Sequence, residues 1–147
     1  MCRIAASLAG LLVFAFAAHA EDVSRGTLTV EVTTRSNTGV IRCAVWPDSK
    51  GFPGEVKTRE DVVRVVAPSI AKHKATCTFP DLPAGTIAVT VLHDLNDNDE
   101  LDKNRIGIPK EPLGFSNGAR IRFGPPKFDD ATFAFAGEDA TIAITVN

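Results

Sequence analysis

Apolar and polar residues alternate with a period of two along most of the chain after residue 26. In residues 27–33, Leu28, Val30 and Val32 alternate with threonines and a glutamate, which is typical of a strand with one buried face. Alternation predicts further strands over residues 40–46, 74–79, 86–94, 131–136 and 140–146. Residues 56–68 are ambiguous, because their valines suit a strand and their charges suit one or two helical turns.

These short strands are separated by turns rich in proline and glycine, and no segment predicts a convincing helix. The pattern predicts an all-β fold, a single antiparallel β-sandwich of about seven strands, with a closed barrel as the alternative. Residues 103–130 show no clear periodicity and form one long irregular loop region. Loops of this length in small domains tend to be functional or mobile.

The N-terminus has the layout of a secretory signal peptide. Arg3 precedes an apolar run over 4–18, and the sequence Ala18-His19-Ala20 has the small-x-small form of a cleavage site. We therefore expect residues 1–20 to be removed and residues 21–147 to form one domain, either periplasmic or secreted. No second long apolar stretch follows, so we expect no membrane span after cleavage.

Charge and cysteine content change the picture in two ways. Loss of Arg3 leaves 15 Lys and Arg against 18 Asp and Glu, and this net charge of −3 argues against nucleic acid and against an anionic membrane surface as partners. Cys43 and Cys77 each share a strand face with apolar residues, so both are expected in the core. In an exported protein this pair predicts one disulfide, with two buried free thiols as the alternative.

The strand over 86–94 runs into an acidic loop that could bind calcium. Oxygen-bearing side chains stand at alternate positions, namely Asp94, Asn96, Asn98, Glu100 and Asp102. Calcium takes six to eight oxygen ligands, and alternate positions of one loop can wrap such an ion. Compared with a helix-loop-helix calcium loop, Asp99 replaces the usual glycine at position six and Arg105 replaces the glutamate at position twelve. Glu111 or a backbone carbonyl would have to complete the shell; the alternative is a solvated loop with local turns.

Catalytic interpretations are weaker. His93, Asp94 and Ser116 allow a Ser–His–Asp triad to be written down, but His93 belongs to an apolar strand face, and Ser116 lacks a strand-to-helix elbow. The chain offers few ligands for a zinc site, because His73 and His93 are distant in sequence and the cysteines are expected to pair. We therefore favour a non-enzymatic module, with a hydrolase using carboxylates or Ser116 as the competing class.

The irregular region also predicts a possible ligand or partner surface. Its candidate residues are Phe115, Ser116, Asn117 and Arg120. Further phenylalanines and cations follow at Arg122, Phe123, Lys127 and Phe128. The alternative is that the phenylalanines fold back as a small core under the loop. The partner of such a surface would be an unknown protein or a small ligand.

The ordered motifs of this region resemble a known family. The chain carries a His-Asp-x-Asn-x-Asn loop, then Leu-Asp, Gly-Ile-Pro-x-Glu, Gly-Phe-Ser-Asn and Gly-Pro-Pro, all between residues 93 and 126. This order is similar to that of the exported bacterial domain-of-unknown-function 2141 family, from which Asp99 departs where glycine is common. The resemblance implies a Greek-key sandwich, transthyretin-like or Ig-like, that binds or assembles rather than catalyses. It assigns no activity.

Overall fold

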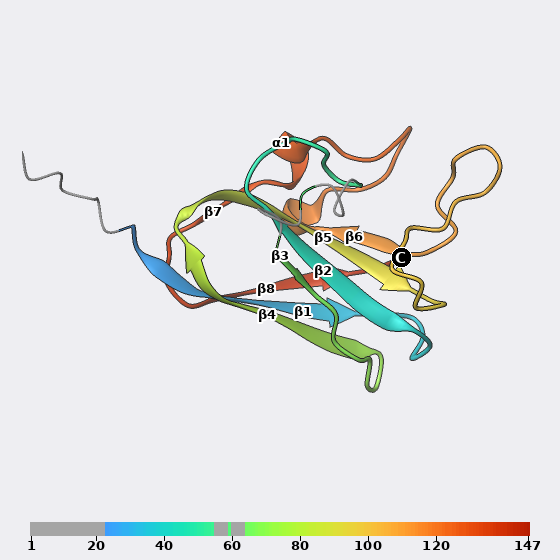
Figure 1. Ribbon diagram of the computed structural model, residues 1–147, viewed down its shortest axis with the longest axis horizontal. Helices are drawn as coiled ribbons and strands as arrows, with labels where there is room; N and C mark the ends of the chain where they lie inside the picture. Colours follow the sequence, from blue (N-terminus) through green and yellow to red (C-terminus); the bar gives the residue numbers. More distant parts are fainter. Residues whose placement is uncertain (1–22, 55–58, 60–63) are drawn as a thin grey trace, which may run out of the picture.

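The computed structural model describes residues 23–54, 59 and 64–147. The expected signal peptide, and most of the ambiguous stretch over 56–68, lie outside the described residues. The described chain forms strands that pack as two sheets (Figure 1). Their bounds are β1 Arg25–Thr33, β2 Val40–Trp46, β3 Arg64–Val66, β4 Lys74–Pro83, β5 Gly85–Asp94, β6 Leu113–Phe115, β7 Phe133–Phe135 and β8 Ala140–Thr145.

The smaller sheet has the strand order β4-β1-β8. β1 pairs antiparallel with β4, so that Val30 lies opposite Cys77, and it pairs parallel with β8, so that Val30 also lies opposite Ile142. The antiparallel sandwich expected from the sequence therefore contains one parallel pair. Alternation along a strand fixes which face is buried but not the direction of its neighbour.

The larger sheet has the order β3-β2-β5-β6, with β7 pairing with the first residues of β5. β2 and β5 are its central strands and run antiparallel, with Val40 opposite Asp94 and Trp46 opposite Ala88. β6 pairs with the middle of β5, which places the connection between them, residues 95–112, beyond the C-terminal end of β5. This end of the sheet carries the acidic loop.

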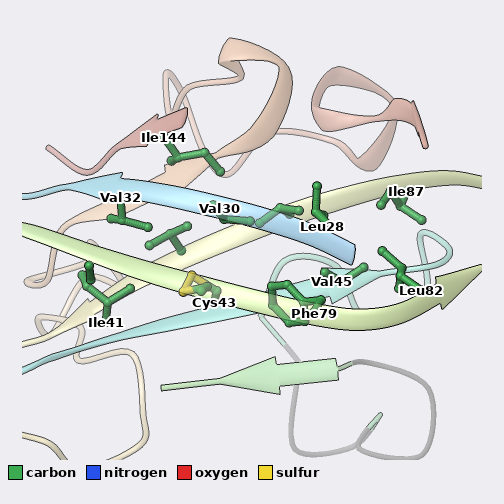
Figure 2. Close-up of a cluster of buried hydrophobic side chains, with 14 of the residues drawn as sticks. Leu28, Val30, Val32, Ile41, Cys43, Val45, Phe79, Leu82, Ile87 and Ile144 are labelled. Atoms are coloured by element: carbon green, nitrogen blue, oxygen red, sulfur yellow. A yellow bond between two sulfur atoms is a disulfide. The ribbon is translucent and has the colours of Figure 1, made fainter. Parts of the chain in front are cut away.

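The core lies between the inner faces of the two sheets, where aliphatic side chains and Phe79 pack (Figure 2). Leu28, Val30 and Ile41 are fully buried, as the alternation predicts. The predicted disulfide is confirmed: Cys43 of β2 and Cys77 of β4 are bonded at a Cα–Cα distance of 6.3 Å. The bond joins the two sheets across the core and closes a loop with a sequence separation of 34.

A second apolar cluster covers the outer face of the larger sheet. Trp46 is fully buried there, and its indole N–H donates to Thr90 Oγ1 at 3.0 Å. Phe52 packs edge-on against Trp46 and Phe128, with ring centroids 5.5 and 5.6 Å apart, and Phe115 completes the cluster. The larger sheet is therefore buried on both faces, which explains why burial along β2 is nearly continuous.

The long irregular region contains short elements that its sequence did not reveal. Besides β6, it forms the 3-10 helix η2 (Ser116–Gly118), and it ends in the four-residue helix α1 (Phe128–Ala131). Both helices lie over the larger sheet (Figure 1). The described residues include no helix long and apolar enough to cross a membrane.

Candidate functional site

Asp94 is the last residue of β5 and the first of the acidic loop. Its carboxylate is fully buried, and Arg42 of the neighbouring strand β2 donates from Nε to Oδ2 at 2.7 Å. The backbone amides of Asn98 and Asp99 also donate to this carboxylate, at 3.1 and 2.9 Å. Asp94 therefore ties the turn of the loop to the side chain of a sheet residue.

These contacts set the protonation of the pair. Burial by itself raises the pKa of the Asp94 carboxyl, but the hydrogen bonds from Arg42 and the two amides outweigh it and hold the pKa below its usual value. For Arg42, which is charged when protonated, burial lowers the pKa. The hydrogen bond to Asp94 and the charges of the nearby carboxylates outweigh this effect and raise the pKa above its usual value. Both groups are charged at neutral pH.

Arg42 also binds the two exposed carboxylates at the loop tip. Its Nη2 lies 2.7 Å from Asp97 Oδ1, and its Nη1 lies 3.2 Å from Asp99 Oδ1. One guanidinium thus faces three carboxylates and reduces the repulsion among them. Sequence reasoning missed this role of Arg42. The available signal was a lone arginine within the apolar strand over 40–46.

Glu111 closes the other side of the loop. It is buried, and its two carboxylate oxygens accept hydrogen bonds from the backbone amides of Leu95 and Asp102, at 2.8 and 3.0 Å. The sequence singled out Glu111 as a possible further metal ligand. The structure instead places it as a clamp between the first and last parts of the loop.

The remaining candidate ligands contact one another. Asn96 and Asn98 donate from their side-chain amides to the Asp102 carboxylate at 2.8 and 3.3 Å, and the side-chain oxygen of Asn98 accepts the amide of Glu100 at 2.9 Å. Within the described part of the chain, no three His, Cys, Asp or Glu side chains are grouped as a metal site. Calcium binding at the loop stays a prediction from the sequence.

The structure does not bring Ser116 together with His93 and Asp94 as a catalytic triad. The ring Nε2 of His93 lies 2.7 Å from the carbonyl oxygen of Thr38, and Ser116 Oγ accepts the amide of Val89 at 2.8 Å. Val89 and His93 are four residues apart in β5, about 13 Å along an extended strand. Asp94 is held by Arg42. Each of these side chains has a structural partner of its own.

The predicted ligand surface divides into buried and exposed residues. Phe115 and Ser116 are buried, and the Ser116 hydroxyl donates to the carbonyl of Ala131, so both belong to the packing under η2. This burial corrects their assignment to a surface. It arises because Phe115 fills the aromatic cluster of the larger sheet. Asn117 and Arg120 are exposed.

Two loops of the irregular region carry the three most exposed large apolar side chains of the described residues, Ile106, Ile108 and Phe123. We call residues 103–110 and 119–127 the apolar–basic loops. Ile106 and Ile108 in the first are 79% and 54% exposed, and Ile121 and Phe123 in the second are 43% and 109% exposed. Each loop contains three Lys or Arg and no Asp or Glu. The sequence singled out Phe123 but not the isoleucines.

Fold and site together define a small disulfide-linked β-sandwich whose acidic loop is held by two buried carboxylates, Asp94 and Glu111. A family model described as "uncharacterized protein conserved in bacteria (DUF2141)" matches residues 30–143, and the chain belongs to this family. The resemblance seen in the sequence motifs is thereby confirmed. No curated protein and no solved structure matches the chain.

Proposed function

We infer that this protein is an exported, non-enzymatic binding module that presents the apolar–basic loops to a component of the bacterial cell envelope. One observation carries the proposal. The buried carboxylates Asp94 and Glu111 hold the backbone of the acidic loop, which leads directly into residues 103–110, whereas the apolar–basic loops contain no carboxylate and expose apolar and cationic side chains. The buried carboxylates therefore position the backbone, and the exposed side chains of the apolar–basic loops are available to contact a partner.

Export is supported by the signal-like segment over 1–20 and by the buried disulfide, because disulfides persist in oxidising compartments. A binding role is favoured over hydrolysis because Ser116 and His93 both bind backbone carbonyl groups. Among the described residues, the Ser116 hydroxyl forms hydrogen bonds with the backbone of Val89 and Ala131 and not with a side chain that could act as its general base.

The experiment is sedimentation of the exported protein with washed cell envelopes of the producing bacterium. The protein is purified after export, and removal of the apolar segment over 4–18 is checked by mass spectrometry, because that segment would itself bind lipid. We expect retention of the wild type and roughly tenfold less retention of Ile106→Ser/Phe123→Ser, since each of these changes removes a side chain able to bury apolar area.

A matched control is Val23→Ser/Val65→Ser, which removes two apolar side chains that are 48% and 41% exposed outside the loops. It should be retained like the wild type. Absence of envelope retention, or equal retention of the loop variant, would contradict the proposed function. A substrate screen in which the wild type shows turnover and a well-folded Ser116→Ala variant does not would favour the hydrolase instead.

A further inference from the structure

The two apolar–basic loops separate charge strongly within the molecule. They contain six Lys and Arg and no acidic residue, so they carry +6, and the remaining residues carry −8 within the whole-chain charge of −2. All six cations are exposed: Lys103, Arg105, Lys110, Arg120, Arg122 and Lys127. None of them forms a salt bridge with any residue that the structure describes. The net charge of the chain gives no indication of this separation.

The acidic residues that follow the loops, Glu111, Asp129 and Asp130, form no salt bridge with the loop cations in the part of the chain that the structure describes. Glu111 is buried and occupied by backbone amides, and Asp130 accepts a hydrogen bond from the amide of Lys127 at 3.1 Å. The cations therefore face solvent beside the exposed isoleucines and Phe123. An apolar tip flanked by cations is complementary to a surface that is anionic outside and apolar beneath.

Hydrogen bonds hold the tip of the first loop in shape. Asn104 Oδ1 accepts the backbone amides of Ile106 and Ile108 at 3.0 and 2.9 Å, and the amide of Asn104 donates to the carbonyl of Ile108 at 2.9 Å. Lys103 and Pro109 form a bridge at the base of this turn. A hydrogen-bonded turn thus holds the side chains of Ile106 and Ile108 in solvent. They can contact a partner without any unfolding of the loop.

The second loop presents Phe123, which the structure leaves fully exposed. Its neighbours Arg122 and Gly124 are joined by a backbone hydrogen bond of 3.3 Å, which reverses the chain at the tip. The base of the loop is tied down, because the Asn117 side chain donates to the carbonyl of Asp130 at 3.2 Å. Both loops extend outward from the body of the two sheets (Figure 1).

We propose that the apolar–basic loops dock this protein on anionic phospholipid, with Phe123 and Ile106 entering the headgroup region and the six cations contacting lipid phosphates. A lipid surface is favoured over a protein partner because the apolar groups stand on convex tips. A bilayer accepts convex tips of any shape, whereas a protein partner would need a recess matched to each. The proposal rests on the proposed function and names its envelope component.

The test is flotation of the exported, processed protein with protein-free vesicles of phosphatidylcholine alone or of phosphatidylcholine with phosphatidylglycerol. We expect binding to the anionic vesicles to exceed binding to the neutral vesicles by at least about tenfold. Raising NaCl from about 0.05 to about 0.5 M should weaken the binding, because the Debye length shortens.

Two variant pairs separate the contributions. Ile106→Ser/Phe123→Ser and Arg105→Gln/Arg122→Gln should each lower vesicle binding roughly tenfold. Neither should change the unfolding temperature, because these side chains are exposed. Lys72→Gln/Lys74→Gln, which removes two exposed cations outside the loops, is the matched charge control and should bind as the wild type does.

Insertion itself is read from Phe123→Trp. The chain has one tryptophan, Trp46, which is fully buried and gives a constant background, so a blue shift on adding anionic vesicles reports residue 123. No blue shift, or equal vesicle binding by wild type and both loop variants, would overturn the lipid proposal. Envelope retention without vesicle binding would overturn it while leaving the proposed function standing, and would point to a protein partner. Loss of both would overturn both.

Discussion

At the scale of single residues, the contact between Arg42 and Asp94 decides how the acidic loop is held. A fully buried carboxylate is costly unless it is paired and hydrogen-bonded, and Asp94 has both kinds of partner. Removing one partner of such a pair leaves the other charge without compensation. The exposed carboxylate of Asp97 contacts the same guanidinium but remains in water, so its contribution is much smaller.

Asp94→Asn is therefore expected to lower the free energy of unfolding by about 2–4 kcal/mol at neutral pH, measured by urea denaturation. Asp97→Asn, whose side chain is 64% exposed, is the control and should cost less than about 1 kcal/mol. Equal costs for the two changes would contradict the anchoring role of Asp94. Calcium binding is tested by measuring the wild type and Asp102→Asn, a change at one of the predicted ligands, with and without calcium: binding requires calcium to stabilise the wild type and to stabilise this variant less.

The pH dependence follows from the same residue. The folded pKa of Asp94 lies below its unfolded value of about 4, so its contribution to stability is complete above about pH 4 and is lost as pH falls through the folded pKa. The difference between wild type and Asp94→Asn should accordingly shrink below about pH 4. Asp48 contributes to the acid sensitivity of both proteins, because hydrogen bonds from Arg59 and the Lys50 amide lower its pKa to about 2.

At the scale of elements, the turn between β1 and β2 must approach the start of the acidic loop closely. Gly39 has a φ of +77°, and a Cβ on it would lie 2.1 Å from the carbonyl oxygen of Asp94. Neither the backbone conformation nor the space suits another residue. The position of Asp94 at the end of β5 therefore depends on a glycine 55 residues earlier in the chain.

Gly39→Ala should lower the free energy of unfolding by more than about 2 kcal/mol and speed hydrogen exchange at the amides of Asn98 and Asp99. The control is Gly85→Ala, where a Cβ meets nothing within 4 Å and the change should cost about 0.5 kcal/mol or less. Unchanged stability and exchange in Gly39→Ala would show that the turn can move away from Asp94.

Elements also differ in how far the sequence predicts them. The sequence predicts the strand over 27–33 closely, because one of its faces is apolar and the other polar. It also predicts the strand over 40–46 closely, because Ile41, Cys43 and Val45 share an apolar face, although both faces of this strand are largely buried. β6 was missed because it has three residues, follows Pro112 and contains Gly114. Its position depends on pairing with β5, which no local pattern within residues 103–130 expresses.

At the scale of the whole molecule, the disulfide links the two sheets and so constrains the unfolded chain more than the folded one. Cys43→Ala/Cys77→Ala should lower the free energy of unfolding by about 3–4 kcal/mol, as expected for closing a loop of this sequence separation. The measurement is a urea transition with and without reductant. Reductant should shift the wild type toward the variant and leave the variant unchanged; a wild type that reductant does not shift, although its thiols are shown to be free, would contradict the prediction.

The sequence by itself determined the fold class, the inner faces of the main strands and the cysteine pair. Successive side chains of a strand point to opposite faces, so the face that is buried shows as apolar residues at every second position. The sequence also marked residues 94–102 as unusual. Only the tertiary structure decided that Arg42 forms ion pairs with the carboxylates of this loop and that Glu111 binds its backbone amides. It also decided that Phe115 and Ser116 are buried. These outcomes depend on which strands become neighbours and on what covers the larger sheet, and residues distant in sequence meet only when the sandwich closes.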